Sequence, residues 1–208
     1  MERRAVVIPA VKKNVAFDND LVKRLGDRFL VQHAIDKACE LERKQRIWVV
    51  TDSQEIELIA HRSGVRCIRD PRLRIEDNDL RRISHLLTES GCECSAFLAL
   101  WPYAPLLEAK TIERAWTEFV LHRHAAMASV VQLSPELYLS HEGLKPVGLG
   151  LPLYRKIRAF EFMTREYVDG GEQPIQPWVI DDPRTEIASF RDWWVCEKLM
   201  GRKRIAFR

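Results

Sequence analysis

Short apolar runs alternate with amphipathic segments along most of this chain, and this alternation restricts the possible folds most strongly. Apolar runs of strand length occupy residues 4–10, 47–50, 65–68, 95–100 and 126–133. Helix-length segments with one apolar face lie between them, at residues 28–42, 54–61, 80–89 and 109–122. Several runs are apolar throughout, as expected for parallel strands that helices cover on both faces. We therefore predict βαβ units in a Rossmann-like three-layer α/β sandwich with a mostly parallel sheet.

The regular alternation stops after Ser134. Residues 134–153 contain three prolines and three glycines, which predicts an irregular excursion with one short strand pair. Beyond it we expect short segments at 153–155 and 159–163, a strand at 175–180 and a final helix at 186–200. Asp182 resembles the N-cap of that helix and Pro183 its first residue. The sequence has no internal repeat or linker, so we predict one domain over residues 1–208.

Charge and cysteine content exclude several classes of partner. The 33 basic and 30 acidic residues are interleaved along the chain, which does not favour a nucleic-acid surface. Residues 201–208 are locally basic, and we interpret them as the solvated end of the last helix followed by a short strand. No apolar run approaches the ~20 residues of a membrane span, and no signal peptide is recognisable. Only Cys92 and Cys94 of the five cysteines are close in sequence, without a zinc pattern. We expect a cytoplasmic protein with reduced thiols and neither nucleic-acid nor membrane partners.

The loop after the first apolar run is the candidate phosphate site. Pro9 ends the run, since proline cannot donate a hydrogen bond to a neighbouring strand, and Ala10 begins a loop with the adjacent lysines Lys12 and Lys13. Ligands of open α/β sheets bind beyond the carboxyl ends of the strands, so a nucleotide's phosphates would lie here. Asp52 follows the second run and faces the same predicted crevice. The alternatives are a solvated loop for the lysines and a helix-capping turn for Asp52.

A series of segments, in order, resembles the cytidylyltransferases that make CMP-sialic acid and related sugars such as CMP-Kdo. Residues 50–56 are a close match to the second-strand motif of that family, and residues 7–10 are similar to its opening. Further similar segments lie at residues 25–30, 69–71, 100–106, 154–155 together with Ala159, and 180–182. The resemblance spans almost the whole chain. It implies a fold of the nucleotide-diphospho-sugar transferase type.

The resemblance also implies an activity. Members of the family transfer a cytidylyl group from CTP to the anomeric hydroxyl of an acidic sugar, release pyrophosphate and use Mg²⁺. It implies that CTP or a nucleotide-sugar is the partner of this chain. The expected nucleotide-binding residues are Pro9, Ala10, Lys12, Lys13 and Asp52.

Two further groups of residues follow from the same resemblance. Trp101, Tyr103 and Arg155 are candidates for a substrate pocket, although the two aromatic residues are equally consistent with a hydrophobic plug. Asp181 and Asp182 match the acidic metal motif and are the candidate Mg²⁺ ligands. The alternative for Asp182 is the helix cap described above.

The chain departs from the family pattern at the loop after the first run. Where the family has arginine, two glycines, serine, lysine and glycine, this chain has Val11, Lys12, Lys13, Asn14, Val15 and Ala16. Trp101 and Ile180 also replace polar residues of the family. Two hypotheses follow: a divergent CMP-nonulosonate cytidylyltransferase-like enzyme, or an inactive pseudo-enzyme that acts as a binding or assembly partner in a glycan pathway. The family dimerises through a longer insertion near residues 134–153, so we expect a weak or different homodimer, or a monomer.

Overall fold

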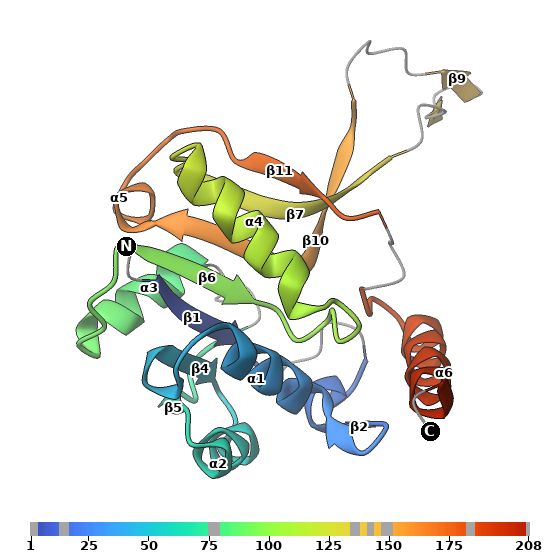
Figure 1. Cartoon of the computed structure of the whole chain (residues 1–208), viewed down its shortest axis with the longest axis horizontal. Helices are drawn as coiled ribbons and strands as arrows, with labels where there is room; N and C mark the ends of the chain where they lie inside the picture. Colours follow the sequence, from blue (N-terminus) through green and yellow to red (C-terminus); the bar gives the residue numbers. More distant parts are fainter. Residues whose placement is uncertain are drawn as a thin grey trace.

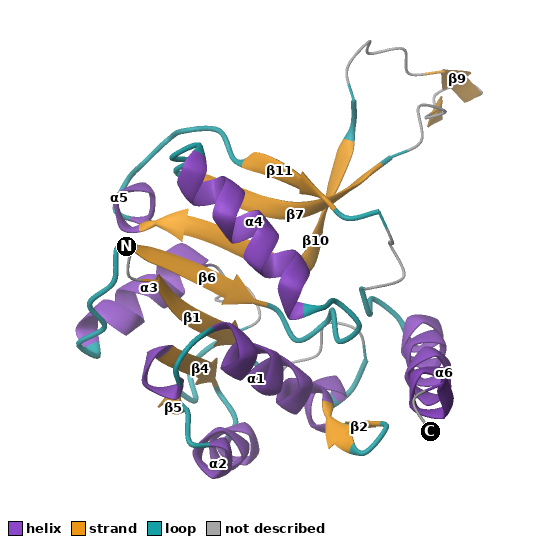
Figure 2. Cartoon of the chain, in the orientation of Figure 1, coloured by secondary structure: helices purple, strands orange, loops and turns teal. Residues whose placement is uncertain are grey.

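A seven-stranded sheet forms the centre of the structure, which is a computed structural model (Figures 1 and 2). It describes residues 4–12, 17–74, 80–133, 138–140, 144–146, 152–181 and 186–206. The sheet strands are β1 (Arg4–Pro9), β4 (Ile47–Thr51), β5 (Arg66–Arg69), β6 (Ala96–Leu100), β7 (Ala126–Gln132), β10 (Tyr154–Thr164) and β11 (Gln176–Val179). Their order is β11-β7-β10-β6-β1-β4-β5, and only β10 runs antiparallel to its neighbours. The predicted mostly parallel α/β fold is confirmed.

Helices cover both faces of the sheet. The helices are α1 (Leu30–Leu41), α2 (Gln54–Ser63), α3 (Leu80–Glu89), α4 (Ala109–Leu121), α5 (Arg165–Val168) and α6 (Phe190–Ala206), with short 3₁₀ turns at Asp20–Val22 and Lys44–Arg46. Val6 and Ile8 of β1 belong to a buried cluster with apolar residues of α1, α2 and α4. Val7 lies in a second cluster with residues of α3 and α5. The continuous apolar runs of the sequence therefore reflect burial on both sides of the sheet.

Two small hairpins lie outside the main sheet. β2 (Arg24–Leu25) and β3 (Arg28–Phe29) form one of them, and the turn between them contains Gly26 with a φ of 67°. Residues 28 and 29 therefore belong to a hairpin and not to the first helix, whose predicted start at residue 28 was two residues early. β8 (Tyr138–Ser140) pairs with β9 (Leu144–Pro146), which confirms the short strand pair predicted within residues 134–153.

The structure corrects the prediction for the C-terminal part in two places. Residues 154–164 form one strand of 11 residues instead of two short segments, and this strand lies between β6 and β7. The final helix begins at Phe190, so the prediction of helix at residues 186–189 was wrong. The helix continues to Ala206, so the basic end is the end of the helix as predicted, but no strand begins before residue 207, where the described residues stop. Ser189 caps α6: its hydroxyl accepts a hydrogen bond from the Asp192 N–H at 3.3 Å, and Asp192 accepts one from the Ala188 N–H at 3.1 Å. Asp182 lies outside the described residues, eight positions before the helix.

A bulge in β10 is held by one buried side chain of β7. The register between β10 and β7 shifts between Lys156 and Glu161. The Ser129 hydroxyl lies inside this irregularity, within 3.1 Å of the Ile157 carbonyl and 2.8 Å of the Phe160 carbonyl, and it accepts a hydrogen bond from the Phe160 N–H at 3.1 Å. Ser129 therefore satisfies backbone groups that the bulge removes from the ladder.

Replacing Ser129 with alanine should lower the free energy of unfolding by roughly 1–3 kcal/mol, because it leaves the buried N–H of Phe160 without its acceptor. Urea unfolding followed by tryptophan fluorescence measures the change. Thr117→Ala is the matched control, since the Thr117 hydroxyl also bonds a carbonyl but is exposed on α4. A loss in Ser129→Ala no larger than in this control would contradict the role given to Ser129.

Within the described residues, no helix is both long enough and apolar enough to cross a membrane.

Candidate functional site

The carboxyl ends of six parallel strands meet at one edge of the sheet, where the amino end of β10 joins them. Because ligands of open α/β sheets bind at this edge, it is the candidate site. Ala10, Asp52, Trp101, Arg155 and Asp181 all follow a strand end or begin β10 there. The topology thus brings residues from five parts of the chain to the same edge.

The segment after β1 is fixed to β4 by a series of hydrogen bonds. The Ala10 N–H donates to the Val50 carbonyl at 2.8 Å, and the Thr51 hydroxyl donates to the Ala10 carbonyl at 2.7 Å. The Lys12 N–H donates to Asp52 Oδ1 at 2.6 Å. These bonds hold the β1 and β4 ends together, and they give Asp52 a defined role in positioning Lys12.

The Lys12 side chain crosses to the start of α2. Its Nζ forms an ion pair with Glu55 at 2.9 Å, in which the side chains are 30% and 52% exposed. An exposed pair of this kind contributes little to stability, so Lys12 can exchange Glu55 for a phosphate at small free-energy cost. Pro9 and Ala10 are buried, and Lys13 lies outside the described residues.

Trp101 and Tyr103 are buried on opposite sides of the sheet. Trp101 is 8% exposed and belongs to the cluster that contains Val11 and Leu73. Its backbone N–H donates to the Ala159 carbonyl at 3.0 Å. Tyr103 is 1% exposed and belongs to the other cluster. The two rings are therefore not brought together around one open pocket.

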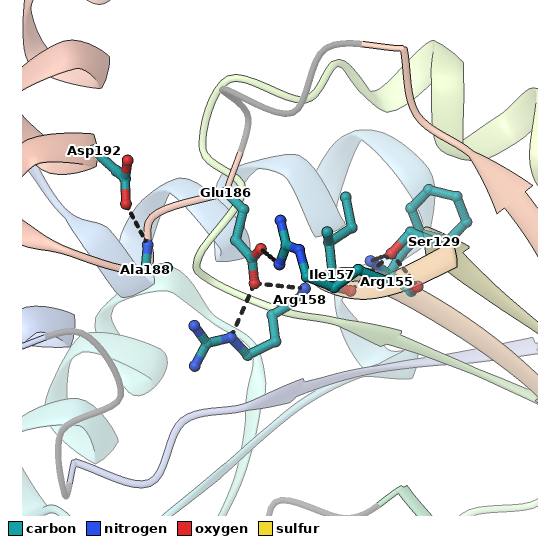
Figure 3. A network of polar contacts seen from close by, with 8 residues as sticks. Ser129, Arg155, Ile157, Arg158, Glu186, Ala188 and Asp192 are labelled. Carbon is teal, nitrogen blue, oxygen red and sulfur yellow. Dashed lines mark hydrogen bonds and ion pairs between the residues drawn. The ribbon is translucent and has the colours of Figure 1, made fainter. Parts of the chain in front are cut away.

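Arg155 lies in an ion-pair network with two residues that the sequence did not indicate (Figure 3). Glu186 accepts from Arg155 at 2.7 Å, from the Arg158 side chain at 3.2 Å and from the Arg158 N–H at 3.1 Å. The Arg158 guanidinium also stacks over the Tyr103 ring at 4.9 Å. Burial opposes the ionisation of Glu186, but the hydrogen bonds from both arginines outweigh it and lower the pKa of its carboxyl.

This network joins the amino end of β10 to the segment before α6. The Ile187 N–H donates to the Tyr103 carbonyl at 2.7 Å, so the same segment also contacts the loop after β6. No periodicity or motif marks Glu186, because its partners lie 28 and 31 positions earlier in the chain. Arg155 and Arg158 remain 49% and 33% exposed and give this edge two guanidinium groups.

Asp181, one of the two candidate metal ligands, lies at the β11 side of the edge. The Ile180 N–H continues the ladder to the Val130 carbonyl at 2.8 Å, and the exposed Asp181 follows it. Asp182 lies outside the described residues. Four strands lie between β11 and β4, so Asp181 and Asp52 are not at neighbouring strand ends. In the described part of the chain, no three acidic, histidine or cysteine side chains form a metal-binding group.

A separate cavity of about 750 Å³ lies between α1, the residues before α4 and α6. Lys37 of α1 lines it and is 8% exposed, and its Nζ donates to the Ala104 carbonyl at 2.6 Å. Burial lowers the pKa of Lys37 to about 7, although Glu40 acts in the opposite direction. Sequence reasoning did not identify this lysine, because a lysine on a helix normally reaches solvent.

Comparison with solved structures gives a consistent result for the fold. The enzyme CMP:2-keto-3-deoxy-manno-octonic acid synthetase, complexed with CTP, has a TM-score of 0.73 at 11% identity, covering 97% of this chain and 99% of that one. This chain has the cytidylyltransferase fold. The fold predicted from the resemblance is thereby confirmed. The sequence itself matches no protein-family model and no curated protein.

Two further structures extend the comparison. A 4-diphosphocytidyl-2C-methyl-D-erythritol synthase from Anaerococcus prevotii has a TM-score of 0.68 at 9% identity, covering 96% of this chain and 99% of that one. A cytidylyltransferase from Leptospira borgpetersenii has a TM-score of 0.60 at 11% identity, covering 93% of this chain and 84% of that one.

Proposed function

We propose that this chain binds CTP at the carboxyl edge of its sheet and transfers CMP to an acidic sugar. The observation that carries the proposal is the group of cations at this edge, Lys12 at the β1 side and Arg155 with Arg158 at the β10 side. A triphosphate and a sugar carboxylate are both anions, and guanidinium groups bind such oxygens in a fixed planar geometry. The similarity in fold to a synthetase complexed with CTP supports the choice of nucleotide.

The reaction requires alignment and charge stabilisation. The sugar hydroxyl oxygen forms a bond to the α-phosphorus as the bond to the pyrophosphate oxygen breaks, and negative charge develops on the leaving group. Lys12 is suited to the phosphates, because its charge is on a flexible stem that Asp52 positions through the backbone. Arg155 and Arg158 are suited to the sugar carboxylate, since Glu186 already fixes their orientation.

A Mg²⁺ ion is compatible with the residues at this edge. Mg²⁺ commonly takes one or two protein carboxylates and completes its coordination with water and phosphate oxygens. Asp181, together with Asp182, would hold it, and an exposed carboxylate such as Asp181 has the required chemistry. The bound ion would neutralise charge on the triphosphate.

The second candidate is an inactive protein of the same fold that acts as a binding or assembly partner in a glycan pathway. It is favoured by the burial of Trp101 and Tyr103, which fill positions where the resembling enzymes carry a polar loop. Lys12 and Arg155 are also engaged with Glu55 and Glu186. Both observations are compatible with a site that has lost its chemistry.

Calorimetric titration with CTP and Mg²⁺ tests nucleotide binding. We expect binding by the wild type, and at least ~10-fold weaker binding by Lys12→Ala and by the double variant Lys12→Ala/Lys13→Ala, since each removes a charge-assisted contact to phosphate. Arg62→Ala is the matched control, because Arg62 is exposed in the last turn of α2, at the end of that helix far from Glu55. The absence of heat at millimolar CTP would contradict the proposal.

Pyrophosphate release separates the two candidates. We expect release from CTP in the presence of an acidic sugar of the sialic acid or Kdo type, and a raised KM for that sugar in Arg155→Ala. CTP binding without release of pyrophosphate from CTP in the presence of any of these sugars would favour the inactive protein.

A further inference from the structure

Cys92 and Cys94 lie close together at the opposite edge of the sheet from the candidate nucleotide site. They occupy the link between α3 and the amino end of β6, and their sulfur atoms are 4.0 Å apart. Cys92 is 9% exposed, Cys94 is half-buried, and Glu93 between them points to solvent. A disulfide requires a sulfur–sulfur distance of about 2.05 Å, so a shift of roughly 2 Å would join them.

The surroundings of Cys92 are electropositive. Arg165 of α5 donates to the Cys92 carbonyl at 3.1 Å and to the Thr88 hydroxyl, and its guanidinium stacks over the Phe97 ring at 5.1 Å. Arg66 of β5 lies over the ring of Trp48, at 4.7 Å from its centroid. The charges of these two guanidinium groups, which come from separate elements, both act on the Cys92 thiol.

These contacts favour the thiolate form of Cys92. The hydrogen bond with the Cys94 thiol lowers the pKa of Cys92 most, Arg165, Arg66 and Trp48 lower it further, and burial only partly opposes them. The same hydrogen bond and burial raise the pKa of Cys94. The first proton therefore leaves the pair from Cys92, while Cys94 keeps its own and donates to the thiolate.

Other cysteines of the chain lack this environment. Burial raises the pKa of Cys39, and burial together with Glu57 raises the pKa of Cys67 to about 12. Cys196 is fully buried in α6. The contrast makes these three residues internal controls for the reactivity of Cys92.

We propose that Cys92 and Cys94 form a peroxide-reactive dithiol site, in which Cys92 is the attacking thiolate and Cys94 the resolving thiol. The Cys92 sulfur attacks one oxygen of hydrogen peroxide, the O–O bond breaks, and sulfenic acid and hydroxide form. The Cys94 sulfur then attacks the Cys92 sulfur, the S–O bond breaks, and water leaves as the disulfide forms. Together the two thiols lose two electrons and two protons, which the peroxide accepts. This site is independent of CTP.

Competition among the five cysteines of the wild-type protein tests the site without any substitution. The reduced protein at pH 7 is treated with graded hydrogen peroxide, the remaining thiols are alkylated, and the peptides are analysed by mass spectrometry. We expect a Cys92–Cys94 disulfide, two hydrogen atoms lighter and reversed by dithiothreitol, at peroxide concentrations that leave Cys39 and Cys67 alkylated. Oxidation of Cys39 before Cys92 would overturn the proposal.

Two variants assign the roles of the sulfur atoms. Cys94→Ser should accumulate a sulfenic acid at Cys92 that dimedone traps, because no resolving thiol is present. Cys92→Ser should lose most of its peroxide reactivity, by at least ~10-fold, since the attacking thiolate is gone and burial still raises the pKa of the remaining Cys94 thiol. Circular dichroism confirms that each variant is folded. Dimedone labelling of Cys94 in the Cys92→Ser variant as fast as that of Cys92 in the Cys94→Ser variant would contradict the assignment.

Discussion

Replacing Glu186 with alanine should lower the free energy of unfolding by roughly 3 kcal/mol, near the lower end of the range for breaking a buried ion pair. Glu186 is 6% exposed and accepts from both Arg155 and Arg158. Its removal leaves two guanidinium groups side by side and separates β10 from the segment before α6. The lower end of the range applies because both arginines are partly exposed to solvent. Urea unfolding at pH 7 measures the change.

Glu186→Gln and Glu172→Ala complete the test. Glu186→Gln keeps an acceptor for the Arg158 N–H, so its loss should be smaller than that of the alanine variant. Glu172 is exposed, and its replacement should change stability by less than about 0.5 kcal/mol. A loss below ~1 kcal/mol in Glu186→Ala would show that the network does not join β10 to the segment before α6.

The same carboxyl predicts a pH dependence. The pKa of Glu186 is lower in the folded protein than its ordinary value of 4.5. The Glu186 carboxyl therefore binds a proton less readily in the folded state than in the unfolded state. Its contribution to the free energy of unfolding is complete above pH 4.5 and is lost as the pH falls through the lower pKa of the folded state.

Raising the pH from 7 to 9.5 should stabilise the wild-type protein more than a Lys37→Met variant, by a difference of roughly 3 kcal/mol. The pKa of Lys37 is about 7 in the folded protein against an ordinary value of 10.5. Between these values the unfolded chain binds one more proton than the folded protein, so the free energy of unfolding rises with pH. Below pH 7 both states are protonated and the penalty of burying the charge is constant. Urea unfolding at several pH values gives the slope of the free energy of unfolding against pH for the wild type and for Lys37→Met.

Lys110→Met is the control for this experiment. Lys110 lines the same cavity but is 79% exposed and paired with Glu108, so its replacement should leave the wild-type slope unchanged. Other groups that titrate in this range are shared by all three proteins and cancel in the comparison. Equal slopes for the wild type and Lys37→Met would mean that Lys37 remains charged when the protein is folded.

The parallel part of the sheet was predictable, whereas the antiparallel strand was not. Val6, Ile8 and Val49 lie in short continuous apolar runs, as expected for parallel strands that are covered on both faces. β10 has no such run, because charged residues interrupt it. Arg155 and Arg158 are partly exposed near its amino end. Glu161 is buried further along the strand, where it forms an ion pair with Lys156. Because of these charges, the sequence pattern did not predict one strand of 11 residues here, or its position between β6 and β7.

The candidate site was predictable where a strand end alone determines it. Lys12 and Asp52 follow neighbouring strands, and the structure joins them by a hydrogen bond. Trp101 and Tyr103 are near neighbours in the sequence but lie on opposite faces, since the chain turns within the loop after β6. Arg155 and Glu186 form an ion pair although they are 31 positions apart in the sequence, and no local sequence pattern predicts such a contact.

The position of β10 also determines the order in which the sheet can assemble on the ribosome. In the part of the chain that the structure describes, β7 pairs only with β10 and β11, both of which are synthesised after it. Four strands can pair once residue 100 has emerged, namely β1, β4, β5 and β6. In contrast, β7 remains unpaired at both edges until the chain has been synthesised as far as residue 164, the end of β10. At typical translation rates this interval lasts roughly two to six seconds. A nascent chain therefore exposes an apolar strand with two open edges during that time, when pairing with another chain is the main competing reaction.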